Sequence, residues 1–194
     1  TVSPGKLSAS LLQAADMLHP QLPEFSEKPL PVVIPVGADQ DPHLRIARDV
    51  AKRIKLHKFI PLSSTNHKFM PGLKGGKMSS SDETSYIALS DSPEAAAKKI
   101  KKYAFSGGQA TLEEHRKKGG NPDVDVSYQM LFYGLEEDDK KLKEIYANYK
   151  SGKLLSGELK NIVIEKLTTF LTEHHKKRKA AEKVVKKYIL EHNL

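Results

Sequence analysis

The sequence predicts an α/β half followed by an all-helical half. A β-branched apolar run at residues 31–36 lies between turn residues, and a stretch with helical periodicity follows it, as in a parallel sheet. From residue 91 onward the pattern is helical. A chain of 194 residues is long enough for two small domains of this kind.

The composition excludes several classes of protein. Hydrophobic residues make up 38% and charged residues 29%, and no run of 18 apolar residues could cross a membrane. Cysteine is absent, which excludes disulfides, thiolate metal sites and a cysteine nucleophile. No signal peptide opens the sequence, and the eight histidines lack metal-ligand spacing.

The charge is unevenly distributed. The formal net charge is +8, which predicts an anionic partner, with nucleic acid first. Residues 150–194 hold eleven Lys and Arg and five Glu, a net charge of +6, so most of the excess lies in the C-terminal quarter.

The first helix is expected from Leu7 to Leu18, before Pro20 and Pro23. Apolar residues recur there at helical spacing, at Leu7, Leu11, Ala14, Ala15 and Leu18. Gln13 and Asp16 are three residues apart and therefore share one edge of this helix. The simpler interpretation is that both side chains only face solvent, as a lone Gln or Asp on a helix usually does.

The apolar run at residues 31–36 is expected to form a buried parallel strand. Gly37-Ala38-Asp39-Gln40 follows as a turn, and a helix then runs from Asp41 to Ile54. Its stripe consists of Leu44, Ala47, Val50, Ala51 and Ile54. Doubly wound sheets bind ligands where a strand ends and the next helix begins, so Asp39 and Gln40 would project into a binding crevice.

The segment from residue 59 to residue 81 is expected to be a short strand, residues 59–62, followed by a long loop. The loop contains Lys74-Gly75-Gly76-Lys77-Met78-Ser79-Ser80-Ser81, in which glycines, lysines and hydroxyls suit a polyanion such as the phosphates of a nucleotide. The spacing is not that of a Walker loop. By composition alone, a flexible polar loop is the alternative.

The second half is expected to be a series of helices. Ser92-Pro93 starts one that runs to about Tyr103, and Thr111 with Glu114 forms a capping box for the next. Further helices are expected at residues 124–135, at residues 137–149 and from Ser156 onward. The stripe of the last helix consists of Leu159, Ile162, Val163, Leu167, Phe170 and Leu171.

A set of motifs in this order resembles a known family. The motifs are Gln-Ala-Ala-Asp at 13–16, Gly-Ala-Asp-Gln-Asp-Pro at 37–42, Lys-Met-Ser-Ser-Ser at 77–81, Ala-Phe-Ser-Gly-Gly at 104–108, Gly-Gly-Asn-Pro-Asp-Val-Asp-Val at 119–126 and Leu-Ser-Gly-Glu-Leu-Lys at 155–160. The chain resembles the tryptophanyl-tRNA synthetases of the archaeal and eukaryotic type, which are class I aminoacyl-tRNA synthetases, over about residues 7–190. The segments at 37–42 and 104–123 are the most specific.

The resemblance implies a Rossmann-type nucleotide-binding domain followed by a helical anticodon-binding domain. Residues 1–90 would be the C-terminal part of the first, and residues 91–194 the whole of the second. The His-x-Gly-His-like signature of the family has no match, so the N-terminal half of the Rossmann domain is expected to be missing and the fragment to be inactive alone. The family also implies a homodimer in the full-length enzyme and a cytoplasmic location.

The implied reaction activates tryptophan with ATP and transfers it to tRNA-Trp, with Mg²⁺ assisting. Lys77, Ser79 and Ser81 would hold the leaving pyrophosphate, and Gly37, Asp39 and Met78 would join them in binding ATP. Ser80 stands where the class I signature has a second lysine, so Lys74 could supply the missing charge. Gln13, Asp16 and Gln40 are the candidates for binding tryptophan, and whether Asp16 or Gln40 accepts the indole N–H is open. No resident metal site is expected.

The tRNA would contact two basic regions of the helical half. The candidate residues are Lys101, Lys102, Gln109, Lys176, Lys177 and Arg178. A run of charged residues is more often only a solvent-exposed face of a helix. Two alternative functions also remain for the chain. One is a non-catalytic RNA-binding module, and the other is a tyrosine-specific relative.

Overall fold

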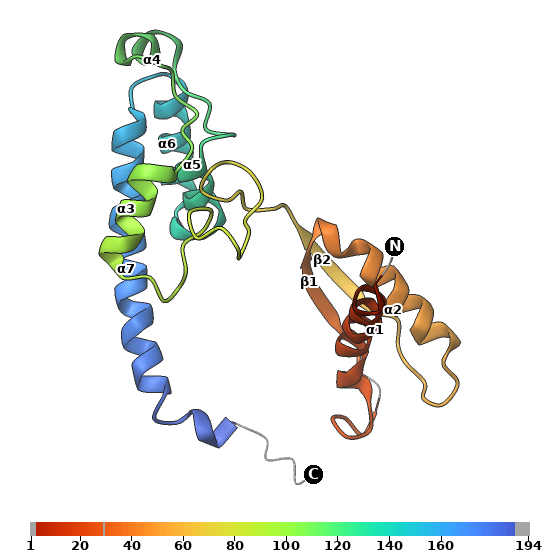
Figure 1. The fold of residues 1–194 in the computed structure, drawn as a ribbon. Helices are drawn as coiled ribbons and strands as arrows, with labels where there is room; N and C mark the ends of the chain where they lie inside the picture. Colours follow the sequence, from red (N-terminus) through yellow and green to blue (C-terminus); the bar gives the residue numbers. More distant parts are fainter. Residues whose placement is uncertain (1–2, 29, 189–194) are drawn as a thin grey trace. The chain divides into compact units, whose positions relative to one another are not determined.

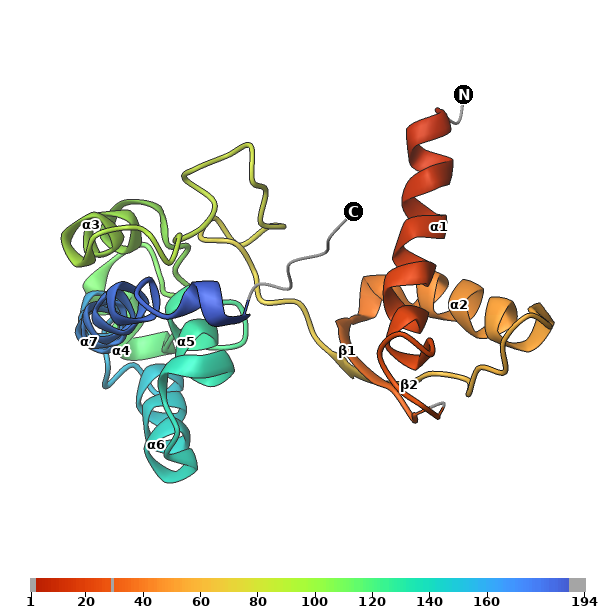
Figure 2. The same cartoon turned by 90° about the horizontal axis from the view of Figure 1, so that it is seen from below.

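A computed structural model describes residues 3–28 and 30–188, without the side chains of Lys6 and Leu7. The chain forms two compact units, Thr1–Phe69 and Met70–Leu194, whose elements are shown in Figures 1 and 2. The Leu7 side chain, expected in the stripe of the first helix, and residues 189–194 of the basic tail lie outside the described parts.

The first unit is a strand–helix–strand unit preceded by a helix. In chain order its elements are α1 (Pro4–Leu18), η1 (His19–Gln21), β1 (Val33–Gly37), η2 (Ala38–Gln40), α2 (Asp41–Arg53) and β2 (Ser63–His67), where η1 and η2 are 3₁₀ turns. The two strands are parallel, in register from Val33 opposite Ser63 to Gly37 opposite His67. The predicted strand–turn–helix is therefore confirmed.

The core of this unit lies between the two helices and one face of β1. The residues buried in it are Ala14, Met17, Leu18, Leu44, Ala47, Ala51 and Leu62, and Ile34 and Val36 pack against them. On the other face of β1, Val33 is 56% exposed. The expectation of a strand buried on both faces is wrong within this unit, because both helices pack on the same side of β1.

The second strand is not where the sequence placed it. Residues 59–62 form no strand, and β2 occupies Ser63–His67, which was expected to be loop. Pro61 has no N–H for a ladder, and Phe59 and Leu62 pack on the helices instead. β2 is polar and largely exposed, so it lacks the apolar alternation that identifies a strand.

The second unit is helical. In chain order its elements are α3 (Pro93–Tyr103), α4 (Leu112–Lys118), α5 (Val126–Met130), the π-helical turn η3 (Leu131–Leu135), α6 (Asp139–Lys150), α7 (Ser156–Ala181) and the 3₁₀ turn η4 (Val185–Tyr188). α3 lies alongside the long helix α7, and α5 and α6 also pack against it (Figure 1).

The predicted helix starts are confirmed where a side chain caps the helix. Ser92 Oγ accepts a hydrogen bond from the Ala95 N–H, and Thr111 Oγ1 accepts one from the Glu114 N–H, both at 3.2 Å. The helix expected over 124–135 begins only after its cap, Asp125, and ends in the π-helical turn. None of the helices in the described residues is long and apolar enough to cross a membrane.

The packing assigns residues 70–90 to the helical unit. Leu73 is 4% exposed and belongs to the same core as Ile100 and Leu131, and its carbonyl accepts a hydrogen bond from the Phe105 N–H at 2.7 Å. The compact units thus divide at Phe69 and Met70, earlier than the expected boundary at residue 90. Where the functional domains divide stays a prediction.

Candidate functional site

The carboxyl end of β1 brings two of the predicted binding residues into direct contact. Gln13 projects from α1, and its Nε2 donates to Gln40 Oε1 at 2.6 Å. Gln40 Nε2 in turn donates to Asp39 Oδ2 at 3.0 Å. These three residues form a polar chain where β1 gives way to α2, which is where a parallel sheet binds its ligands.

Gly37 lies against this polar chain, with no room for a side chain. A Cβ at this position would lie 2.9 Å from the Asp39 carboxylate and would also approach Phe69 and His67. A side chain here would therefore displace Asp39. Asp16 is exposed on α1 and is not joined to the polar chain by a side-chain hydrogen bond within the described residues.

The signature loop, residues 72–85, belongs to the second unit and carries the predicted phosphate-binding residues. Ser79 Oγ and Ser81 Oγ are 2.8 Å apart and share a hydrogen bond. Lys77 is exposed and has no ion-pair partner among the described residues. Lys74 differs, because its Nζ lies 2.9 Å from Asp82 Oδ2. Of the two lysines, Lys77 is thus the one without a carboxylate partner in the described residues.

Two residues that sequence reasoning missed hold this loop together. Ser85 is 5% exposed, and its Oγ accepts from the Ser79 N–H and donates to the Ser79 carbonyl, both at 3.0 Å. Asp82 accepts from the Thr84 N–H at 3.0 Å as well as from Lys74. Hydrogen bonds from Thr84 and Lys74 lower the pKa of Asp82 to about 2. Neither residue stood in a recognisable motif.

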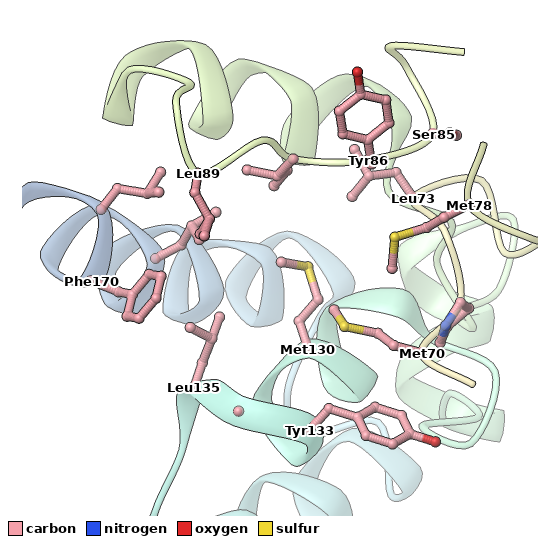
Figure 3. Close-up of a pocket in the computed structure, with 15 residues that line it drawn as sticks. Met70, Leu73, Met78, Ser85, Tyr86, Leu89, Met130, Tyr133, Leu135 and Phe170 are labelled. Atoms are coloured by element: carbon pink, nitrogen blue, oxygen red, sulfur yellow. The ribbon is translucent and has the colours of Figure 1, made fainter. Parts of the chain in front are cut away.

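An apolar cavity of about 290 Å³ lies beside the signature loop (Figure 3). Its walls come from the segment after Met70, from the π-helical turn and from α7. Met78 projects from the signature loop toward Met70 and Met130 in Figure 3. Met78, which is 39% exposed, thus places an apolar side chain at the edge of this cavity, between Lys77 and Ser79.

The predicted tRNA-binding residues are exposed but lie in different surroundings. Lys101 and Lys102 occupy the last turn of α3, and Lys176 and Arg178 lie on α7. Lys177 forms an exposed ion pair with Glu173 at 2.6 Å. Gln109 Nε2 donates to the Gly119 carbonyl at 3.0 Å, which leaves its amide oxygen to accept. No group of three or more acidic or histidine residues in the described parts could hold a metal.

A family model described as "tRNA synthetases class I (W and Y)" matches residues 1–172. The chain belongs to this family. The class I tRNA synthetase match includes both candidate regions, the polar chain at the end of β1 and the signature loop, and it ends before the basic run at residues 176–179.

Curated relatives in this synthetase family are named for tryptophan. The chain is 48% identical over 186 residues to the tryptophan–tRNA ligase of Methanocaldococcus jannaschii, covering 95% of this chain and 50% of the relative. It is 43% identical to the cytoplasmic tryptophan–tRNA ligase of Saccharomyces cerevisiae, covering 98% of this chain and 44% of the relative. The chain thus spans about half the length of these relatives.

A solved tryptophanyl-tRNA synthetase has the same fold. The enzyme from Aeropyrum pernix superposes with a TM-score of 0.92 at 46% identity, covering all of this chain and 53% of the solved one. The predicted family and the Rossmann-like plus helical fold class are therefore confirmed. The roles of the individual site residues remain predictions.

Proposed function

We propose that the protein to which this chain belongs is a tryptophan–tRNA ligase. The tryptophan carboxylate attacks the α-phosphate of ATP, and pyrophosphate leaves, which gives tryptophanyl-adenylate. The terminal ribose hydroxyl of tRNA-Trp then attacks the activated carbonyl, forms the ester and releases AMP. The observation that carries the proposal is the hydrogen bond from Gln13 to Gln40 at the ligand-binding end of β1. The tryptophan–tRNA ligase names of the relatives support it.

The polar chain would bind the amino acid. Because Gln13 donates through Nε2, its Oε1 is left to accept from the α-ammonium group of tryptophan. The indole N–H needs an acceptor, which either the second lone pair of Gln40 Oε1 or the exposed Asp16 carboxylate supplies. Asp39 fits a ribose hydroxyl, and Gly37 allows its carboxylate to stay in place, because a Cβ at residue 37 would lie 2.9 Å from it. The backbone of Gly37 would contact the nucleotide.

The signature loop would stabilise the charge that develops on the phosphates. Lys77 would supply the cation, and the Ser79 and Ser81 hydroxyls would supply hydrogen bonds. Met78, which lines the neighbouring cavity, would contribute its backbone to ATP binding. Mg²⁺ is a hard cation that binds substrate phosphates, and we propose that it assists here as it does in other sites for nucleotides. It would neutralise charge on the leaving pyrophosphate.

An ATP–pyrophosphate exchange assay with tryptophan and with tyrosine tests the proposal. The assay uses this chain joined to the segment of the Aeropyrum pernix relative that it does not cover, with the chain alone in parallel. Exchange that depends on tryptophan supports the ligase, exchange that depends on tyrosine supports a tyrosine-specific relative, and no exchange together with RNA binding supports a non-catalytic module. We expect no exchange from the chain alone.

The chain itself offers a direct test of amino-acid binding. It contains no tryptophan, so indole fluorescence reports only the added ligand. Asp16→Ala and Gln40→Ala should separate the two acceptors, because the variant without the indole acceptor binds tryptophan more weakly.

The proposal also includes the homodimer and the cytoplasmic location, and the name of the yeast relative supports the location.

A further inference from the structure

The signature loop is closed by its own hydrogen bonds. The Gly72 N–H donates to the Gly76 carbonyl at 2.7 Å, and the Leu73 N–H donates to the Ser85 carbonyl at 2.8 Å. These bonds join the start of the loop to its middle and to its end. The loop is therefore held in shape by its own backbone hydrogen bonds, although most of its side chains are exposed.

Ser85 fixes the part of the loop that carries the phosphate-binding hydroxyls. Its Oγ accepts from the Ser79 N–H, and its single proton is shared between the Asp82 carbonyl at 2.7 Å and the Ser79 carbonyl at 3.0 Å. One nearly buried hydroxyl thus sets the position of Ser79 and, through the shared hydrogen bond, of Ser81. A chain segment held in its binding shape avoids the entropy cost of ordering when the ligand arrives.

Asp82 determines which lysine remains free. It holds Lys74 at 2.9 Å and is itself fixed by the N–H and the hydroxyl of Thr84. Lys74 and Lys77 lie three residues apart in the sequence, yet only Lys74 has a carboxylate partner in the described residues. Asp82 also places a negative charge in the loop that is meant to receive a polyanion.

We propose that Ser85 is a positioning residue that pre-forms the signature loop for a polyphosphate, and that Asp82 sets which lysine of the loop faces the ligand. Ser85 holds the Ser79 backbone in place, and Asp82 retains Lys74 so that Lys77 is the cation presented to the ligand. This inference rests on the proposed function, because it deepens the role of the same loop.

The experiment titrates the isotope-labelled chain with inorganic pyrophosphate and follows the loop amides by NMR. In the wild type, pyrophosphate should shift the amides of residues 77–81, and Lys77→Ala should weaken binding about tenfold. Ser85→Ala should expose the Ser79 amide to hydrogen exchange and weaken binding roughly three- to tenfold. Ser85→Thr keeps a hydroxyl and should preserve both properties.

A matched control is Ser92→Ala. It removes a hydroxyl that caps α3 in the same unit but does not touch the loop, so Ser79 protection and pyrophosphate affinity should stay unchanged. The amide spectrum of α7 reports whether each variant is folded.

Asp82→Asn tests the second half of the proposal with the opposite sign. Asparagine keeps an acceptor for Thr84 but loses the charge, so pyrophosphate should bind about two- to fivefold more tightly. Lys74→Ala should change affinity little in the wild type and should remove the gain in the Asp82→Asn background.

The outcomes are distinguishable. If pyrophosphate binds through Lys77 but Ser85→Ala and Asp82→Asn leave its affinity unchanged, the positioning roles are wrong and the proposed function stands. If the wild type does not bind pyrophosphate, or Lys77→Ala binds it equally well, the phosphate site itself is refuted. Ser85 would then only stabilise the loop, and the proposed positioning role would be refuted together with the phosphate site.

Discussion

Tyr149 donates its hydroxyl to Asp125 at 2.7 Å in the interior of the helical unit, where the exposed fractions of the two residues are 0% and 1%. The other oxygen of Asp125 accepts from the N–H groups of Ser127 and Tyr128, and Oδ2 also accepts from the Gly107 N–H at 2.8 Å. One carboxylate therefore joins the loop before α4, the start of α5 and the end of α6.

Replacing Tyr149 by phenylalanine should destabilise this unit. The change removes a donor from a buried carboxylate and also breaks the contact with Ser156 Oγ, so we expect a loss of about 1–3 kcal/mol in the free energy of unfolding. Urea unfolding followed by circular dichroism measures it. Tyr133→Phe is the control, since the Tyr133 hydroxyl makes no hydrogen bond within the described residues, and equal stability of the two variants would contradict the prediction.

Gly119→Ala should be at least as damaging. Gly119 has a φ of +75°, and a Cβ there would collide with the Lys150 carbonyl, which is backbone and cannot move aside cheaply. We expect a loss of about 2 kcal/mol or more. Gly157→Ala, at the start of α7, meets nothing within 4 Å and should be neutral or slightly stabilising. A Gly119→Ala variant as stable as the wild type would show that the turn relaxes.

These contacts explain the motifs that made the family resemblance specific. Gly107 and Gly119 stand where a side chain would meet backbone, and Asp125 caps a helix while binding Tyr149. Such residues hold the helical unit together and need not touch a substrate. A motif can therefore identify a family although its residues serve the fold.

Sequence reasoning succeeded where the signal was local. The caps Ser92 and Thr111 act within one helical turn, so their pattern was enough to place α3 and α4. It failed for β2, because Ser63–His67 becomes a strand only by pairing with β1. The burial of Leu73 in the helical core likewise depends on tertiary packing, so the compact units divide at Phe69 and Met70, while the functional boundary near residue 90 that the resemblance implies stays a prediction.

The candidate site was predictable in its residue types but not in its connections. Gln13 and Gln40 are 27 positions apart, and only the fold shows that one donates to the other. The sequence left open whether Lys77 acts alone or together with Lys74, since the pairing of Lys74 depends on Asp82 reaching back across the loop. Ser85 was not predicted at all, because its role comes from burial beneath Ser79.

In the complete enzyme, made by joining this chain to the segment of the Aeropyrum pernix relative that it does not cover, Lys77→Ala should slow adenylation more than it weakens tryptophan binding. The lysine would act on charge that develops on the phosphates, so removing one charge-assisted interaction should lower the exchange rate on the order of 10²-fold or more. Lys74→Ala should have a smaller effect, because Asp82 already holds that lysine. Exchange rates and indole fluorescence titrations of both variants decide the matter, and equal losses would show that the lysines share the work.

Asp82 should titrate well below an ordinary aspartate. The Thr84 hydroxyl and the Lys74 ammonium favour its charged form and lower its pKa to about 2. Because the folded pKa lies below the ordinary value of 3.8, its contribution to stability is present above that value and is lost as the pH falls toward 2. The carboxyl carbon shift measured by NMR gives the midpoint. Lys74→Ala should raise the pKa only part of the way, since Thr84 remains, and a midpoint near 3.8 in the wild type would refute the loop geometry.

The chain should bind tRNA without ATP or tryptophan, and the binding should weaken as salt rises. Phosphate contacts supply affinity that carries no sequence information, so the double variant Lys176→Glu and Lys177→Glu should weaken all tRNAs alike. Its salt slope should fall by about one for each phosphate that the two lysines neutralise in the wild type. The exposed ion pair between Lys177 and Glu173 contributes little and does not prevent this. Filter binding at several salt concentrations measures both quantities, with Lys140→Glu and Lys143→Glu on α6 as a charge-matched control.

Variants of Gln109 test base recognition separately from the electrostatic attraction between the lysines and the tRNA phosphates. The Gln109 Nε2 is held by the Gly119 carbonyl, so only the amide oxygen is left to accept a hydrogen bond from a base. If it reads the anticodon, Gln109→Ala should reduce the difference in affinity between cognate and non-cognate tRNA without changing the salt slope. Gln109→Glu keeps an acceptor but loses the donor to Gly119, and it therefore separates the two uses of the amide. If discrimination survives in Gln109→Ala and only the unfolding free energy falls, Gln109 serves to hold the turn at Gly119 against the loop that precedes α4.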